Sequence, residues 1–172
     1  MSNVALIACT WLHLIATVVW IGHIVNSFIL FTPLSKRYVP ESSYGDFLAN
    51  YRRRDQPIAL STIATFFVTG LGLMLLDPEY QGLGSIFANS WSIMVFAKHV
   101  IVLVMVGLGI YMGTAIMPRL AKAWSELASE EITHSTTNPR VTGLERLRNI
   151  VAYSLLVLSL VVLLLTAIGE TI

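Results

Sequence analysis

The sequence predicts an all-α integral membrane protein, a four-helix bundle that forms a single domain over residues 1–172. Two observations predict this class. First, 55% of the residues are hydrophobic and only 12% are charged, whereas soluble domains carry about 25% charged residues. Second, the apolar residues gather into four runs, and a run of about 18 residues or more is long enough to cross a bilayer as a helix.

We expect the membrane helices at about residues 4–31, 57–76, 91–117 and 150–168. The first run stops before Pro33 and the second stops before Pro78, since a helix usually ends ahead of a proline. Pro57 suits the first turn of the second helix, where its missing N–H is not needed.

The segments between these runs also have helical features. Residues 41–54 are expected to form a short interfacial helix that turns Phe47, Leu48 and Tyr51 towards lipid. Residues 119–132 have helical composition and are expected to extend the third helix. Thr142 followed by Glu145 predicts a capping box at the start of the last helix.

The basic residues predict the orientation in the membrane. Ten of the eleven lie in the first and third loops, the eleventh is Lys98, and the loop over residues 77–90 has none. Because cytoplasmic loops carry the excess of lysine and arginine, loops one and three are predicted to be cytoplasmic. Both termini and loop two are then outside the cell, and the plasma membrane is the expected location.

Several functional classes lack a sequence signal. The net charge of +1 gives no reason to expect nucleic acid binding. The one cysteine, Cys9, lies in the first apolar run and cannot form an internal disulfide. There is no Walker loop, and the GLGS stretch in loop two does not fit a dinucleotide fingerprint.

Two histidines are predicted at matching depth. With a helical rise of about 1.5 Å per residue, His13 and His99 each lie roughly 7 Å on the outer side of the middle of their helices. Two imidazoles that face each other across a bundle can ligate a haem iron from both sides. Imidazole is also a good copper ligand. His13 and His99 are therefore the candidate haem or metal ligands, and packing or hydrogen bonding is the alternative role for each.

Lys98 and His23 are the other ionisable candidates within the runs. Lys98 is expected to snorkel outward or to pair with an anion such as a haem propionate or Glu170. His23 lies on the inner side of the middle. It is a candidate to hold a second cofactor with Met112, to line a quinone pocket or relay a proton, or simply to pack. A copper path along Met74, Met94, His13 and His99 is a further possibility, since thioethers select copper(I).

Three stretches carry a family resemblance. In chain order they are WLHLIATVVWIGHIV, FAKHVIVLVMVGLGIYMGTAIMPRL and RLRNIVAYSLLVLSLVVLLLTAIG. They resemble the first, third and last helices of the CopD-like copper-resistance membrane domain. HemJ-type membrane proteins, regarded as b-type haem proteins linked to protoporphyrinogen oxidation, share a pattern that falls on His13 and Lys98. The chain departs from them in having His99 after the lysine and no paired histidines downstream.

The leading hypothesis is a b-type cytochrome-like membrane protein. Haem b sits between the first and third helices on His13 and His99, near Lys98, and the chain transfers electrons to a quinone or a redox partner subunit. An electron-transfer subunit is favoured over a stand-alone enzyme, and an oligomer is possible. The alternative is a CopD-like copper transport or resistance protein that uses the same histidines. A third hypothesis is a structural subunit of a membrane complex without a cofactor.

Overall fold

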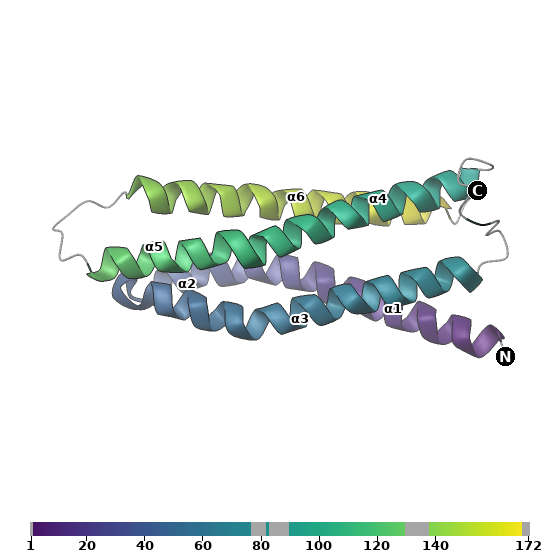
Figure 1. Ribbon diagram of the computed structural model, residues 1–172, viewed down its shortest axis with the longest axis horizontal. Helices are drawn as coiled ribbons and strands as arrows, with labels where there is room; N and C mark the ends of the chain where they lie inside the picture. The colour runs from purple at the N-terminus through teal and green to yellow at the C-terminus, as the bar shows by residue number, and fades with distance from the viewer. Residues whose placement is uncertain (1, 77–81, 83–89, 130–137, 170–172) are drawn as a thin grey trace.

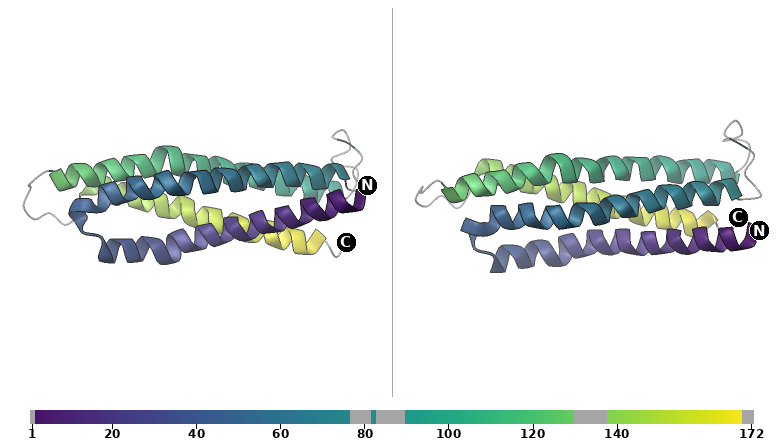
Figure 2. Two further views of the ribbon diagram at one scale, coloured as in Figure 1. Left: turned by 90° about the horizontal axis from the view of Figure 1, so that it is seen from below. Right: turned by 60° about the horizontal axis from the view of Figure 1, so that its bottom comes forward.

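Long helices that run side by side make up the computed structural model, which describes residues 2–76, 82, 90–129 and 138–169 (Figure 1). Within these ranges, four helical rods are long and apolar enough to cross a membrane. This confirms the predicted all-α membrane class. The start of α1 and the end of α6 lie at the same end of the bundle (Figure 2).

Two of the rods contain a π-helical segment. The first rod consists of α1 (Ser2–Val25), the π-helix η1 (Asn26–Phe31) and α2 (Thr32–Tyr38). The third consists of α4 (Ser90–Tyr111), the π-helix η3 (Met112–Ile116) and α5 (Met117–Ser129). The second rod is α3 (Glu41–Leu76) and the fourth is α6 (Pro139–Gly169).

Each rod extends past the apolar run that predicted it, because hydropathy marks the part of a helix that lies in lipid and not where helical hydrogen bonding ends. Helix α2 accommodates Pro33 in its first turn. Pro57 lies inside α3 and not in a first turn, because α3 already begins at Glu41. The extension of the third rod through Ser129 agrees with the expected helical segment.

The start of the last helix differs from the predicted capping box. Asn138 caps α6: its Oδ1 accepts a hydrogen bond of 2.9 Å from the Arg140 backbone N–H, and Pro139 is the first helical residue. Thr142 lies inside the helix and its hydroxyl donates to the Asn138 carbonyl. Glu145 pairs instead with Lys36 of α2.

The core has two clusters along the bundle. One joins the four rods near their middle and contains Trp20, Ile24, Met105, Ile116, Val151 and Leu155. The other lies at the end where α2 meets α3 and contains Tyr44, Leu48, Leu120, Ala121, Ala123 and Val141. Leu48 is only 2% exposed and Phe47 packs against the same cluster. Residues 41–54 are helical as expected, but the prediction of a separate short helix with Phe47 and Leu48 towards lipid is wrong: this segment is the first part of α3 and packs against α5.

Candidate functional site

His13 on α1 is held against α3 by a hydrogen bond. Its Nδ1 lies 2.9 Å from the Thr69 hydroxyl, which itself donates to the Thr65 carbonyl at 2.6 Å. Because that hydroxyl hydrogen is already used, the Thr69 oxygen accepts a hydrogen bond from His13 Nδ1–H. The Phe66 ring packs edge-on against the imidazole, with 4.7 Å between the ring centroids. This arrangement fixes the tautomer and leaves Nε2 as the electron-pair donor of the ring.

His99 on α4 has the same tautomer. Its Nδ1 lies 2.7 Å from the Val95 carbonyl oxygen, which can only accept, so Nδ1 carries the hydrogen and Nε2 carries the lone pair. His99 is exposed and shares a helix face with Val102 and Val106, three and seven residues further on. The two imidazoles lie close enough to interact electrostatically.

A cavity of about 150 Å3 lies beside His13, and we call it the His13 cavity. Its walls come from α1, α3, α4 and α6. The donor atoms among its lining residues include the imidazole of His13 and the thioether of Met105, which is buried in the first core cluster. Val102 and Val106 also line it, which places His99 on the same face of α4 as this wall.

A second cavity of about 150 Å3 lies further along the bundle, and we call it the His23 cavity. His23 Nδ1 is 3.5 Å from the Asp55 carboxylate. Tyr51, four residues before Asp55, shares a hydrogen bond of 3.1 Å with Ser27. Met112 lines this cavity too, so His23 and Met112, which the sequence paired as a candidate second site, do share one cavity.

Trp20 borders both cavities. It is 8% exposed, lies seven residues after His13 on α1, and lines both cavities. Its ring fits against Gly109 of α4, where a Cβ atom would lie 3.3 Å from the indole. The indole N–H is buried and has no hydrogen-bond partner within the described parts of the chain.

The remaining candidates lie outside both cavities. Lys98 is partly buried on α4 and lines neither cavity. Its suggested partner Glu170 lies outside the described residues, as does loop two. Met74 and Met94 are partly buried and line neither cavity. Across residues 2–76, 90–129 and 138–169, no group of three or more His, Cys, Asp or Glu side chains could hold a metal ion.

Sequence analysis missed Thr69, which holds His13. It also assigned no site role to five residues that line the cavities: Trp20, Met105, Asp55, Arg52 and Arg148. The spacing of Trp20 from His13 is a heptad, which does place the two residues on one face of α1. Thr69 had no comparable signal, because an alcohol in an apolar helix most often bonds its own backbone.

A family model described as copper resistance protein D matches residues 51–168 of the chain. No match was found among curated proteins or among solved structures. The resemblance to HemJ-type proteins gains no support from these comparisons.

Proposed function

The chain belongs to the copper resistance protein D family, and from this premise we propose that it is a membrane protein that conducts copper ions through the interior of its helix bundle. The observation that carries the proposal is the pair of cavities in series. Each cavity has an imidazole and a thioether in its wall, His13 with Met105 and His23 with Met112. Imidazole suits copper and thioether selects copper(I).

The hydrogen bonds of the histidines support a metal-binding role. Histidines that bind metals nearly always donate the hydrogen of their second ring nitrogen to an oxygen of the protein, which orients the ring. His13 does so to Thr69 and His99 does so to the Val95 carbonyl. Both Nε2 atoms are therefore prepared to bind a cation, which would enter at His99 and His13 or leave there.

Trp20 gives the path a barrier. Trp20 and Ile63 line both cavities, and in this proposal these side chains move when an ion passes from one cavity to the other. A transporter needs a gate of this kind between its two ends, since an open pore would let ions pass without selection. In this proposal the ion is cargo and is bound by few ligands at each step, which allows it to leave.

The cavity size favours copper over haem b. A cavity of about 150 Å3 holds a molecule of the size of benzene, and a porphyrin is several times larger than benzene. A single ion fits beside His13 in a cavity of this size, which is too small to enclose a porphyrin. The quinone and the redox partner subunit belong to the haem hypothesis and gain no separate support.

Metal content and absorption spectrum of the purified protein test the proposal. We expect colourless protein that binds copper(I) and whose affinity falls in His13→Leu and Met105→Leu, because both side chains line the His13 cavity. Met94→Leu is the matched control, since Met94 lines neither cavity and should leave the affinity unchanged.

A Soret band that disappears in His13→Leu and His99→Leu would instead support the cytochrome hypothesis and overturn the proposal. Colourless protein that binds no copper would contradict both the copper and the haem proposals and would favour the hypothesis of a structural subunit without a cofactor.

A further inference from the structure

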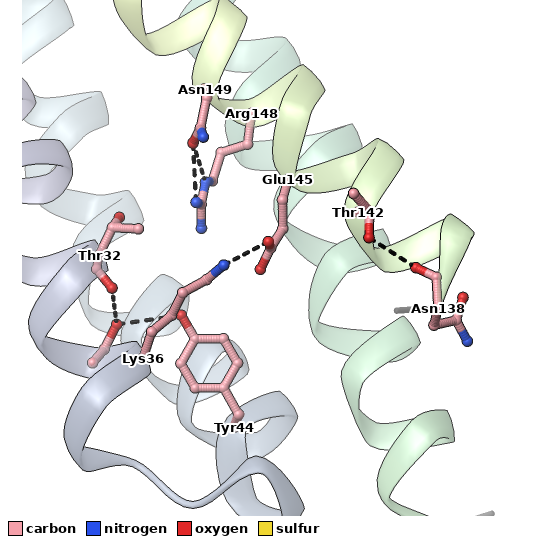
Figure 3. Close-up of polar contacts among 9 residues, drawn as sticks. Thr32, Lys36, Tyr44, Asn138, Thr142, Glu145, Arg148 and Asn149 are labelled. Atoms are coloured by element: carbon pink, nitrogen blue, oxygen red, sulfur yellow. Dashed lines mark hydrogen bonds and ion pairs between the residues drawn. The ribbon is translucent and has the colours of Figure 1, made fainter. Parts of the chain in front are cut away.

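Two arginines, Arg148 and Arg52, line the His23 cavity. Arg148 of α6 lines it and is 4% exposed. Its guanidinium donates through Nε and Nη2 to the side-chain oxygen of Asn149, at 3.2 and 3.0 Å, and that amide is neutral. Figure 3 shows Arg148 extending from α6 towards the segment that carries Thr32 and Tyr44, two other residues of the cavity wall.

The acidic groups near Arg148 are paired with other residues. Glu145, one turn earlier on α6, pairs with Lys36 (Figure 3). Asp55 lines the cavity but pairs with His23. No ion pair joins Arg148 to an acid in the described parts of the chain. A buried charge is costly unless it is paired, and Arg148 is a buried cation that forms no ion pair within the described residues.

Two further donors point to the same kind of ligand. Arg52 of α3 also lines the cavity and donates to the neutral Gly113 carbonyl at 3.2 Å, with Gln56 at 3.5 Å. Trp20 also lines this cavity, and its buried N–H has no hydrogen-bond partner in the described parts of the chain. An oxyanion supplies several acceptor oxygens to such donors, and arginine pairs with phosphate in a charge-assisted, often bidentate geometry.

Most of the exposed wall of the cavity is nevertheless apolar, and the cavity opens sideways. The wall includes Phe28, Ile63 and Leu155. Leu60 of α3 and Ile110 of α4 also line the cavity although they are 50% and 47% exposed, so its mouth lies on the lipid-facing surface between these two helices. A ligand that reaches the arginines from this mouth has a charged head inside and an apolar chain in the bilayer.

We propose that the His23 cavity binds the phosphate group of an acidic membrane lipid, with Arg148 and Arg52 as its cationic contacts and the acyl chains leaving between α3 and α4. Basic pockets between membrane helices on the cytoplasmic side bind such headgroups in other proteins. The cavity lies in the half of the bundle nearest the arginine-rich loop segments, whose side is predicted to be cytoplasmic. The site shares the His23 cavity with the proposed copper path, but its contacts are Arg148 and Arg52 and not the proposed copper ligands, so a lipid-binding test can fail while the copper proposal stands.

Thermal unfolding of the full chain in a neutral detergent tests the proposal. The probes are phosphatidylglycerol, phosphatidylcholine and inorganic phosphate at matched ionic strength. At a hundredfold excess over Kd, phosphatidylglycerol should raise Tm by roughly 5–10 °C. Arg52→Gln and Arg148→Gln should require at least about tenfold more lipid for the same rise. Arg146→Gln, an exposed neighbour outside the cavity, should behave as the wild type.

Arg148→Lys covers the case in which Arg148→Gln does not fold. It keeps the charge but loses the planar fork, so its lipid requirement should lie between those of the wild type and Arg52→Gln. The proposal is overturned if phosphatidylcholine gives the same rise, or if the lipid requirement is unchanged in the cavity variants. If inorganic phosphate alone gives the full rise and this rise depends on both arginines, the anion site is supported but its source is free phosphate, which overturns the lipid assignment.

Discussion

Thr69 decides which nitrogen of His13 is available to a metal ion. By accepting the Nδ1 hydrogen it fixes the ring plane and presents Nε2. The hydroxyl accepts this bond because its own hydrogen is given to the Thr65 carbonyl one turn earlier. One buried alcohol on α3 therefore orients the proposed ligand on α1.

Thr69→Val removes the acceptor and keeps the shape of the side chain. We expect the unpaired N–H of His13 to lower the free energy of unfolding by about 1–3 kcal/mol. Copper(I) affinity should fall by roughly 10–100-fold, the usual effect of losing such a supporting contact. Competition with a chromophoric chelator measures the affinity. Thr69→Ser restores the hydroxyl and should bind as the wild type, and an affinity unchanged in Thr69→Val would refute this role.

At the residue scale, the helical rise predicts the level of a side chain along its helix but not the direction in which the side chain points. The helical rise of about 1.5 Å per residue placed His13 and His99 at one level, and the structure brings them within electrostatic range. The rise does not say which neighbouring helix a side chain faces. His13 faces Thr69 and Phe66 of α3, a partner that emerges only when the helices are packed together.

At the scale of elements, both π-helical segments lie in the wall of the His23 cavity. Ser27 and Phe28 come from η1, and Met112 and Gly113 come from η3. A π-helical turn widens the helix and is often found at functional sites. Here it coincides with a polar contact between rods, since the Gly113 carbonyl accepts from Arg52. Hydropathy could not predict these segments, because a π-turn changes hydrogen-bond register without changing the apolar pattern.

The contact between α3 and α5 depends on Gly45. A Cβ atom there would lie 2.6 Å from Ser125 N and 2.7 Å from the Ala121 carbonyl oxygen, both of which are backbone atoms. Gly45→Ala must push the two helices apart, and we expect it to lower the free energy of unfolding by about 1–3 kcal/mol.

The matched control for this substitution is Gly143→Ala on α6. That position is exposed and a Cβ atom meets nothing within 4 Å. This change should be neutral or should stabilise the protein by up to about 1 kcal/mol, since alanine favours a helix over glycine. Equal melting temperatures for the two variants would show that the contact between α3 and α5 is looser than in the structure.

At the scale of the whole molecule, four rods bring the chain ends to one end of the bundle and the arginine-rich segments to the other (Figure 1). The two cavities follow each other along this axis, and Trp20 borders both. The number of membrane helices was predictable because four apolar runs are unambiguous. The two cavities could not be predicted from the sequence, because each is lined by residues from at least three of the rods and so depends on how the rods pack.

The orientation predicted from the basic residues can be tested with single cysteines. In a Cys9→Ser background, Ser85→Cys in loop two should react with a membrane-impermeant maleimide applied to intact cells. Ser42→Cys, near the first turn of α3, should react only after the membrane is permeabilised. The opposite pattern would place the arginine-rich loops outside and would reverse the orientation of both cavities.

Copper(I) uptake into proteoliposomes that contain the purified protein is the most direct measure of the central claim. We expect uptake by the wild type and by Met94→Leu, and its loss in His13→Leu and Met105→Leu at equal amounts of folded protein. Uptake that continues at the wild-type rate without His13 and Met105, or no uptake by the wild type at all, would contradict a copper path through the two cavities.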